Sequence, residues 1–395
     1  MDHAIVEEKT TQASAVLDEL GFDCWLTFCR ESDAIGEPSL PFVLGYDVVW
    51  PAVVLLTADR DRIAILGEND ATPAQELGVH DVYTYRESLE PILQDQLATI
   101  DPDTIAINYA EDFRTADGLT HGMYRRLVGH LDGTPYADRF VSASDVIRRV
   151  RGRKSPTERD RIYRAAETTE ELLGRFAEAW EPDWTEAMIA DWLHDRMADR
   201  DLGPAWSPAY CPAVDAGDAA TAGHTIPGDR TLPPGEVLHF DFGVRYDGYT
   251  ADLQRCYYRP SAEAAEPPVE VRTVFQDVRA AIDAGIETIE PGRKGRDVDA
   301  AARETLTDRG WPEPNHGIGH EVGREAHDGG TLFGPPWEPY GASVEASVHE
   351  GGIYAVELGV DTEYGYIGLE DMIEVTESGV EYVVEPQRSL RILGA

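Results

Sequence analysis

Lysine is nearly absent from this chain of 395 residues, which contains only Lys9, Lys154 and Lys294. Arginine carries almost all of the basic charge, and 74 acidic against 34 basic residues give a formal charge of -40 at pH 7. A surface of this sign repels phosphate, so nucleic acid and anionic membranes are not expected as partners. Such a composition is typical of proteins that stay soluble in concentrated salt, where charges are strongly screened. We therefore expect a salt-accumulating halophile as the source; the alternative, a mesophilic acidic protein, would normally contain more lysine.

Cysteine pairs, long apolar runs and export signals are also missing. The four cysteines show no CxxC spacing and are most simply buried thiols of a reducing compartment. No apolar run approaches the length that spans a membrane. The first residues, MDHAIVEEKTTQ, lack the basic segment and apolar segment of a secretion signal. We expect a cytoplasmic protein.

The length and the 42% hydrophobic content predict two globular domains. In residues 1–150, short β-type runs alternate with helical stretches, which predicts an α/β domain with a largely covered sheet. This part has no phosphate-binding glycine loop, so a structural or assembly role is expected for it. The composition turns basic at VIRRVRGRKSP, where we place the boundary. Residues 151–395 predict an α+β domain, with helices expected at 157–180, 185–200, 269–288 and 296–309 and strands at 353–360 and 367–375.

The segment HFDFGVRYDGYTAD is predicted to form a β-hairpin. Asp247-Gly248 supplies the positive φ angles of a two-residue turn between two β-rich arms. A turn centred there puts Asp252 opposite Gly243, and hence diagonal to Asp241 on the same face. Two carboxylates so close repel each other unless a cation lies between them. The alternative is a pair of solvated aspartates beside the turn, and the other candidate residues of the chain distinguish the two interpretations.

Further candidate ligands follow in the C-terminal half. His316, His320 and His327 fall within twelve residues and alternate with glycines, while Glu357 and Glu370 lie in strand-like runs. A carboxylate that points inward from a strand is costly unless it is paired or bound to metal. Each residue alone could simply face water. Together, two aspartates, one histidine and two glutamates suit two divalent ions better than a tetrahedral structural zinc.

In order and spacing, these residues resemble the pita-bread metallopeptidases, a clan that includes methionine aminopeptidase, aminopeptidase P, prolidase and the metal-free creatinase. The resemblance rests on the two aspartates eleven residues apart, on GHEVG with a second histidine beyond it, on ELG and on GLED, and it spans most of residues 150–385. The segment RRVRGRKSPTERDRIYRAAE resembles the start of the catalytic domain of prolidases and aminopeptidase P. The expected fold is therefore a creatinase/prolidase-like α/β domain, residues 1–150, followed by an α+β pita-bread catalytic domain, residues 151–395.

The resemblance implies a role for each candidate residue. Two divalent ions, Mn²⁺ first and Co²⁺, Zn²⁺ or Fe²⁺ as alternatives, would be bound by Asp241, Asp252, His320, Glu357 and Glu370. Attack would come from metal-bound hydroxide, with Glu357 as the general base and His327 stabilising the oxyanion. His224 would line the substrate pocket and relay protons, and His316 would help to hold the scissile carbonyl. Because all five ligands are present, a creatinase-like mechanism is not expected.

The implied activity is release of an N-terminal residue from X-Pro peptides or dipeptides, by a homodimer that acts on small peptides. Three features depart from the family. The usual EPG is ELG here, with Leu358 at its centre. Gly368 replaces an arginine of the family, and the loss of this arginine is expected to alter or enlarge the pocket. The segment after His327 is long, and its Trp337 and Tyr340 could line a modified site or, as we favour, cover the sheet.

Two other functions stay open. One is a metal-dependent hydrolase or lyase of a small non-peptide metabolite on the same fold, which would keep the metals and not cleave X-Pro peptides. The other is a catalytically silent binding protein, which a metal-free purified protein would indicate.

Overall fold

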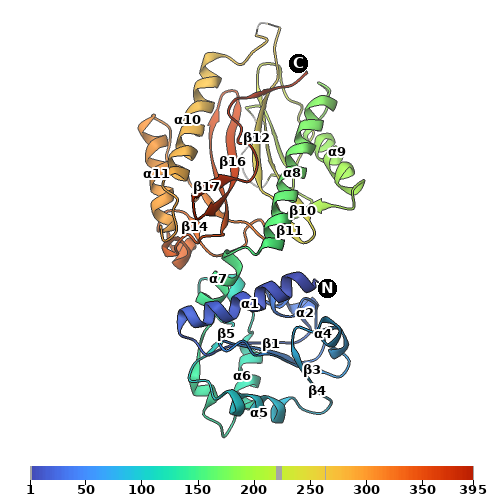
Figure 1. Ribbon diagram of the computed structural model, residues 1–395. Helices are drawn as coiled ribbons and strands as arrows, with labels where there is room; N and C mark the ends of the chain where they lie inside the picture. The colour runs from blue at the N-terminus through green and yellow to red at the C-terminus, as the bar shows by residue number, and fades with distance from the viewer. Residues whose placement is uncertain (1, 219–224, 263, 395) are drawn as a thin grey trace. The chain divides into compact units, whose positions relative to one another are not determined.

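The computed structural model describes residues 2–218, 225–262 and 264–394. The chain divides into two compact units, Met1–Arg151 and Gly152–Ala395, each built around a sheet of its own (Figure 1). No helix in the described part of the chain combines the length and the apolar character that crossing a membrane requires.

The first unit contains a mixed six-stranded sheet in the order β4-β3-β2-β1-β5-β6. Its helices lie on both faces, α1 on one and α5 and α6 on the other (Figure 1). Helix α1 ends where the sequence predicts, at Gly21, whose left-handed backbone lets its N–H bond the carbonyls of Leu17 and Asp18. The strands are β1 Cys24–Cys29, β2 Ala52–Thr57, β3 Arg62–Gly67, β4 Asp81–Tyr85, β5 Ile105–Ile107 and β6 Phe140–Ser142. The helices are α1 His3–Leu20, α2 Ser32–Ile35, α3 Leu40–Val43, α4 Ala71–Leu77, α5 Glu90–Ile100, α6 His121–His130 and α7 Ser144–Gly152, with 3-10 turns η1 Arg114–Ala116 and η2 Tyr136–Arg139.

The second unit contains a nine-stranded sheet whose main path is β14-β13-β15-β16-β12-β9-β8, with β17 beside β16 and β18 beside β12. A smaller sheet has the order β11-β10-β7. The strands are β7 Gly203–Pro204, β8 Ala213–Ala216, β9 Val237–Phe242, β10 Val244–Tyr246, β11 Tyr249–Thr250, β12 Leu253–Tyr258, β13 Gly319–Glu321, β14 Leu332–Phe333, β15 Ile353–Thr362, β16 Gly365–Thr376, β17 Gly379–Tyr382 and β18 Arg391–Ile392. The helices are α8 Pro156–Ala179, α9 Glu186–Ala198, α10 Val269–Glu287 and α11 Gly295–Asp308, with a 3-10 segment η3 Glu338–Glu345.

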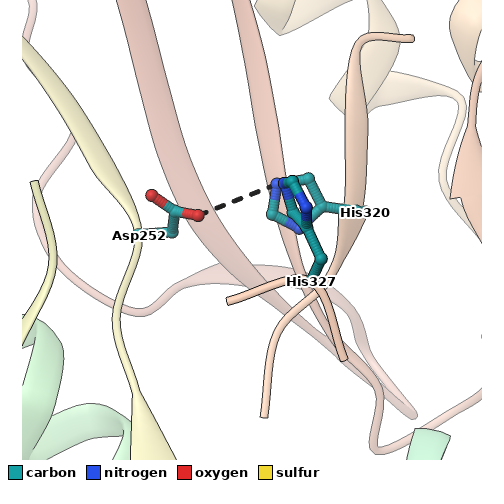
Figure 2. Close-up of side chains that lie close together, drawn as sticks. All are labelled: Asp252, His320 and His327. Atoms are coloured by element: carbon teal, nitrogen blue, oxygen red, sulfur yellow. Dashed lines mark ion pairs between the residues drawn. The ribbon is translucent and has the colours of Figure 1, made fainter. Parts of the chain in front are cut away.

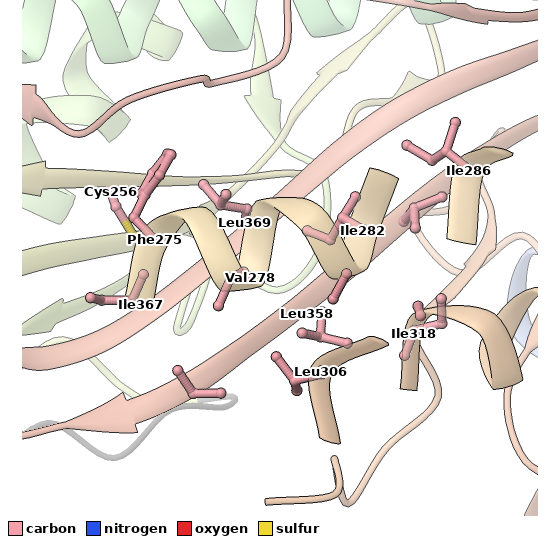
Figure 3. Packing of buried hydrophobic residues seen from close by; sticks show 14 of the residues in the cluster. Cys256, Phe275, Val278, Ile282, Ile286, Leu306, Ile318, Leu358, Ile367 and Leu369 are labelled. Atoms are coloured by element: carbon pink, nitrogen blue, oxygen red, sulfur yellow. The ribbon is translucent and has the colours of Figure 1, made fainter. Parts of the chain in front are cut away.

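Long helices pack against this sheet. Helix α8 starts with a capping box, in which Ser155 accepts from the Glu158 N–H and Glu158 accepts from the Ser155 N–H. Its Phe176 meets Phe240 of β9 edge to face, with ring centroids 4.9 Å apart. On the other half of the sheet, α10 packs on β15 and β16 (Figure 3).

The α10 contact decides which residues of β15 and β16 face the other way. Leu358 and Leu369 are cross-strand partners that pack against α10 (Figure 3). Successive side chains of a strand point to opposite faces. Glu357 and Glu370, which are also partners, therefore lie on the face turned away from α10.

Candidate metal centre

Strand pairing aligns four polar side chains in one row across the sheet. Asp241 of β9 is opposite Gln254 of β12, Gln254 is opposite Glu370 of β16, and Glu370 is opposite Glu357 of β15. Residues directly opposite each other in antiparallel strands share a face. The row therefore brings three of the five predicted ligands to the face that Glu357 occupies.

The other two predicted ligands reach this face by the same alternation. Asp252 is two residues before Gln254, just ahead of β12. His320 of β13 is opposite Ala355, which is two residues before Glu357 on β15. Side chains two apart in an extended chain point the same way.

The predicted hairpin is confirmed. Tyr246 pairs with Tyr249 across a two-residue turn in which Asp247 and Gly248 have φ angles of 44° and 81°. The same register continues into the pairing of Phe242 with Leu253, so Asp252 falls opposite Gly243 as predicted. A Cβ at Gly243 would lie 1.8 Å from the Ala251 carbonyl oxygen, so the close approach here requires glycine.

The ligand atoms of these residues converge. Three groups each have atoms within 4.8 Å of one another: Asp252, His320 and His327; His320, Glu357 and Glu370; and Asp241, Asp252 and Glu370. Figure 2 shows the first group, in which the rings of His320 and His327 lie 4.2 Å apart between centroids. The five predicted ligands are thus brought together, with the exposed His327 beside them.

The spacing within the cluster leaves room for a cation. His320 Nε2 lies 3.7 Å from Glu370 Oε1, 3.8 Å from Asp252 Oδ2 and 3.9 Å from Glu357 Oε1. These distances are too long for hydrogen bonds. Among the described residues, Asp241 Oδ1, Asp252 Oδ1 and Glu370 Oε1 are buried without a hydrogen-bond partner. Buried carboxylate oxygens that lack donors are the oxygens that a divalent ion would bind.

The pKa shifts of the clustered residues also indicate a cation site. Burial, and then the charge of Glu357, raises the pKa of Asp241 to about 7. Burial and the neighbouring carboxylates hold the pKa values of Asp252 and Glu370 well above their ordinary range. Burial also holds the pKa of His320 well below its usual value, so the ring is neutral and its lone pair is free for a ligand bond. Without a cation the cluster retains protons, and a bound divalent ion would displace them. The residues present therefore fit a metal centre.

The loop that carries His327 is tied down by a buried ion pair. Lys154 Nζ lies 3.1 Å from Asp328 Oδ2, and both side chains are almost fully buried. Gly323, in the same loop, accepts hydrogen bonds from the N–H and the hydroxyl of Thr250. Lys154, one of the three lysines of the chain, thus holds Asp328, the residue next to His327.

The two remaining predicted residues are not part of these groups. His316 lies in a loop whose backbone is held from two sides: Arg303 donates to the His316 carbonyl, and the Gly317 N–H donates to the Tyr340 hydroxyl. His224 lies outside the described residues. Tyr340 also stacks on Trp337, with centroids 5.7 Å apart, and η3 packs against α11. The long segment after His327 therefore supports the His316 loop.

The departure at Gly368 does not enlarge the site at this position. A Cβ on Gly368 would lie 2.4 Å from Tyr366 Cε1, 2.8 Å from Gln254 Oε1 and 2.9 Å from His239 Nε2. Gly359, the cross-strand partner of Gly368, is covered by the same tyrosine, because its Cβ would lie 2.4 Å from the Tyr366 hydroxyl. Tyr366, Gln254 and His239 fill the space, so the lining is altered and closed.

Sequence reasoning did not single out these three residues or Asp215, which bonds His239. One signal could have found the first three: Gln254 is two residues after Asp252, His239 is two before Asp241, and Tyr366 is four before Glu370. Even spacing along a strand predicts a shared face.

Comparison with known proteins identifies the family of this chain. The sequence profile of Metallopeptidase family M24 matches residues 160–377, more than half of the chain, and the chain belongs to this family. It is 24% identical over 253 residues to an Xaa-Pro dipeptidase of Pyrococcus horikoshii, covering 64% of this chain and 68% of that protein. It is 25% identical over 280 residues to an Xaa-Pro dipeptidase of Lactobacillus delbrueckii subsp. lactis, covering 70% and 71%.

Solved structures extend the similarity to nearly the whole chain. An X-Pro aminopeptidase from Thermotoga maritima superposes with a TM-score of 0.70 at 22% identity, covering 97% of this chain and 99% of that one. An Xaa-Pro dipeptidase from Bacillus anthracis gives 0.72 at 21% identity, covering 98% and 99%. The predicted pita-bread fold and the predicted family are confirmed, and the protein is a metallopeptidase.

Proposed function

We propose that this metallopeptidase binds two divalent ions and releases the N-terminal residue from X-Pro peptides or dipeptides. The observation that carries the proposal is the convergence of two buried carboxylates (Asp252 and Glu370), two half-buried ones (Asp241 and Glu357) and one neutral imidazole on a single face of the sheet. The relatives named Xaa-Pro dipeptidase and X-Pro aminopeptidase support the choice of substrate. Manganese is our first choice of metal, with cobalt, zinc or iron as alternatives.

Five residues would hold the ions: Asp241, Asp252, His320, Glu357 and Glu370. When bound, such ions act as Lewis acids that polarise a carbonyl and make water nucleophilic near neutral pH. Glu357 is only half-buried and can be reached by a water molecule, so we assign it the proton transfer as general base.

The histidines around the ligands would act on the substrate. His327 is exposed and touches the group that contains Asp252 and His320, so its N–H can stabilise the charge that develops on the scissile carbonyl oxygen. We assign His316 to holding the same carbonyl, and His224 to lining the pocket and relaying protons, on the resemblance alone.

Composition and resemblance extend the proposal beyond the site. The charge of -40 and the scarcity of lysine support a cytoplasmic protein of a salt-accumulating cell. The resemblance supports a homodimer. Light scattering on the full chain in molar KCl tests the dimer, and a monomeric mass would contradict it.

The test compares hydrolysis of Ala-Pro with that of an Ala-Pro-Ala tripeptide, in molar KCl with Mn²⁺ or Co²⁺. Asp252→Asn and Glu357→Gln should abolish cleavage, whereas Asp183→Asn, at an exposed position of the same unit, should leave it unchanged. The preferred substrate separates a dipeptidase from an aminopeptidase.

Absence of cleavage by a protein that carries about two metal ions per chain would contradict the X-Pro assignment. It would favour the second candidate, a metal-dependent hydrolase or lyase of a small non-peptide metabolite. The closed lining at Gly368, formed by Tyr366 and His239, is the observation that keeps this candidate open.

A further inference from the structure

A chain of buried polar groups leads to Glu357 from the edge of the sheet. Asp215 Oδ2 lies 2.9 Å from His239 Nδ1, and His239 Nε2 lies 3.0 Å from Gln254 Oε1. Gln254 Nε2 then donates to Glu357 Oε2 over 2.6 Å. Asp215, His239 and Gln254 are 1%, 3% and 5% exposed, so water does not compete for the two bonds that join them.

This series of hydrogen bonds gives the two carboxylate oxygens of Glu357 different surroundings. An ionised carboxylate oxygen only accepts hydrogen bonds, so the amide N–H₂ of Gln254 must face Oε2 and the amide oxygen must face His239. The other oxygen, Oε1, is turned toward the ligand cluster, 3.9 Å from His320 Nε2. One oxygen is thus occupied by the protein and the other is offered to the cluster.

Packing holds Gln254 in this orientation. Its strand lies between the strands of Asp241 and Glu370, and it pairs with both residues. The ring of Tyr366 packs edge to face on His239, with centroids 4.9 Å apart. Gly368 provides the necessary room, because a Cβ there would lie within 3 Å of both Gln254 and His239.

We propose that Gln254 is a positioning residue of the metal centre, which bonds Glu357 Oε2 and so turns Oε1 toward the ion, favouring binding through that one oxygen. The inference rests on the proposed function, because it takes Glu357 as a ligand. A carboxylate that binds through one oxygen uses one coordination position instead of two. The position left over is available to water or substrate, which a catalytic metal needs. Hydrogen bonds to a ligand from outside the metal's own shell also fix its orientation and strengthen binding.

The test measures metal binding directly. Mn²⁺ is titrated calorimetrically, in molar KCl, into metal-free wild-type protein, Gln254→Met and Gln254→Asn. The methionine has a similar length and no donor; the asparagine retains the amide on a shorter stem, for use if the first variant does not fold. We expect dissociation constants about 10- to 100-fold higher for both variants. Gln387→Met is the matched control, since Gln387 is a buried glutamine that bonds the Cys256 backbone and the Ser389 carbonyl, and its loss should leave the constant unchanged.

Two further measurements distinguish positioning from general support of the fold. In the Co²⁺-loaded protein, Gln254→Met should weaken the visible absorption bands, because Glu357 can then bind through both oxygens and raise the coordination number. In a Glu357→Gln background, Gln254→Met should cause no additional loss of Mn²⁺ affinity, since the residue that it positions is already changed. A merely structural role would give equal losses in both backgrounds and an unchanged spectrum.

The possible failures are separable. If wild-type protein binds Mn²⁺ and the Gln254 variants match it in affinity and spectrum, this inference is overturned while the proposed function stands. If wild-type protein binds no Mn²⁺ or Co²⁺ at all, the proposed function falls, and this inference falls with it.

Discussion

Without its metal ions, the protein should lose stability as the pH rises, and Asp252→Asn should reduce that loss. The cause is the ligand cluster, in which buried carboxyl groups hold their protons more tightly than an unfolded chain does. Asp241 has a folded pKa of about 7 against an ordinary value of 3.8, and the pKa values of Asp252 and Glu370 are raised in the same direction. At a pH between the ordinary pKa of such a carboxyl group and its raised pKa in the folded protein, the folded state binds more protons than the unfolded state. The free energy of unfolding therefore falls as pH increases over this range.

The size of the effect follows from the shift of Asp241. Each unit of pKa difference corresponds to about 1.4 kcal/mol, so a shift from 3.8 to about 7 gives a loss of up to about 4 kcal/mol between pH 4 and pH 7. Asparagine at position 252 cannot ionise, and it also removes one of the charges that raise the pKa of Glu370. The metal-free variant should therefore be more stable than metal-free wild type at pH 8, and its stability should fall less steeply with pH.

Urea unfolding in molar KCl with a chelator, at several values between about pH 5 and pH 8, measures both quantities. Other carboxyl groups titrate in both proteins, so the difference between the two curves isolates the cluster, and Asp183→Asn should follow the wild type. Addition of Mn²⁺ at about 100 times its dissociation constant should stabilise wild type by about 2.7 kcal/mol and the Asp252→Asn variant much less. A metal-free wild type whose stability is flat or rises over this range, or a variant less stable at pH 8, would refute the reasoning.

Three more perturbations follow from buried groups. Gly368→Ala places a Cβ 2.4 Å from Tyr366 Cε1 and should cost about 1–3 kcal/mol in urea unfolding, together with a loss of X-Pro cleavage; unchanged activity and stability would show that the ring moves freely. Lys154→Met leaves the buried Asp328 without its ammonium partner and should destabilise by about 3–5 kcal/mol, with partial recovery on adding Asp328→Asn; an additive double variant would contradict this. Burial raises the pKa of Glu37 to about 7, so wild type loses up to about 3 kcal/mol as pH rises from 4.5 to 7, and Glu37→Gln should flatten that dependence; parallel curves would argue against it.

The sequence predicted those features that depend on local pattern. Helix α10 was expected at residues 269–288 and is found at Val269–Glu287, because its apolar residues recur at helical spacing and pack as one stripe on the sheet. The turn at Asp247-Gly248 and its register were predicted from turn chemistry alone. The convergence of Asp241 with Asp252 follows from that register. For the remaining ligands, the resemblance supplied what local pattern does not.

Other features depend on pairings that no local pattern encodes. The bond between Gln254 and Glu357 joins residues 103 positions apart and requires the adjacency of β12, β16 and β15. The bond between His239 and Asp215 requires β8 to pair with β9 in one register. Gly368, in place of an arginine, was expected to alter or enlarge the pocket, whereas the structure shows the ring of Tyr366 against this glycine. A departure from a family pattern therefore does not by itself indicate open space, because a residue two positions away on the same face can occupy it.

The alternation of side chains along β15 and β16 links the candidate metal centre to the hydrophobic core. Leu358 and Leu369 bury their side chains against α10, and their neighbours Glu357 and Glu370 are the paired carboxylates of the site. A slip of one residue in this pairing would turn the leucines into the ligand cluster and the glutamates into the core, at a cost far above that of either change alone. The core thus sets the register that brings the proposed ligands together, while the bond from Gln254 orients one of them, Glu357. Register and orientation are separate requirements, and this is why Gln254→Met is expected to change metal affinity in a protein whose fold remains intact.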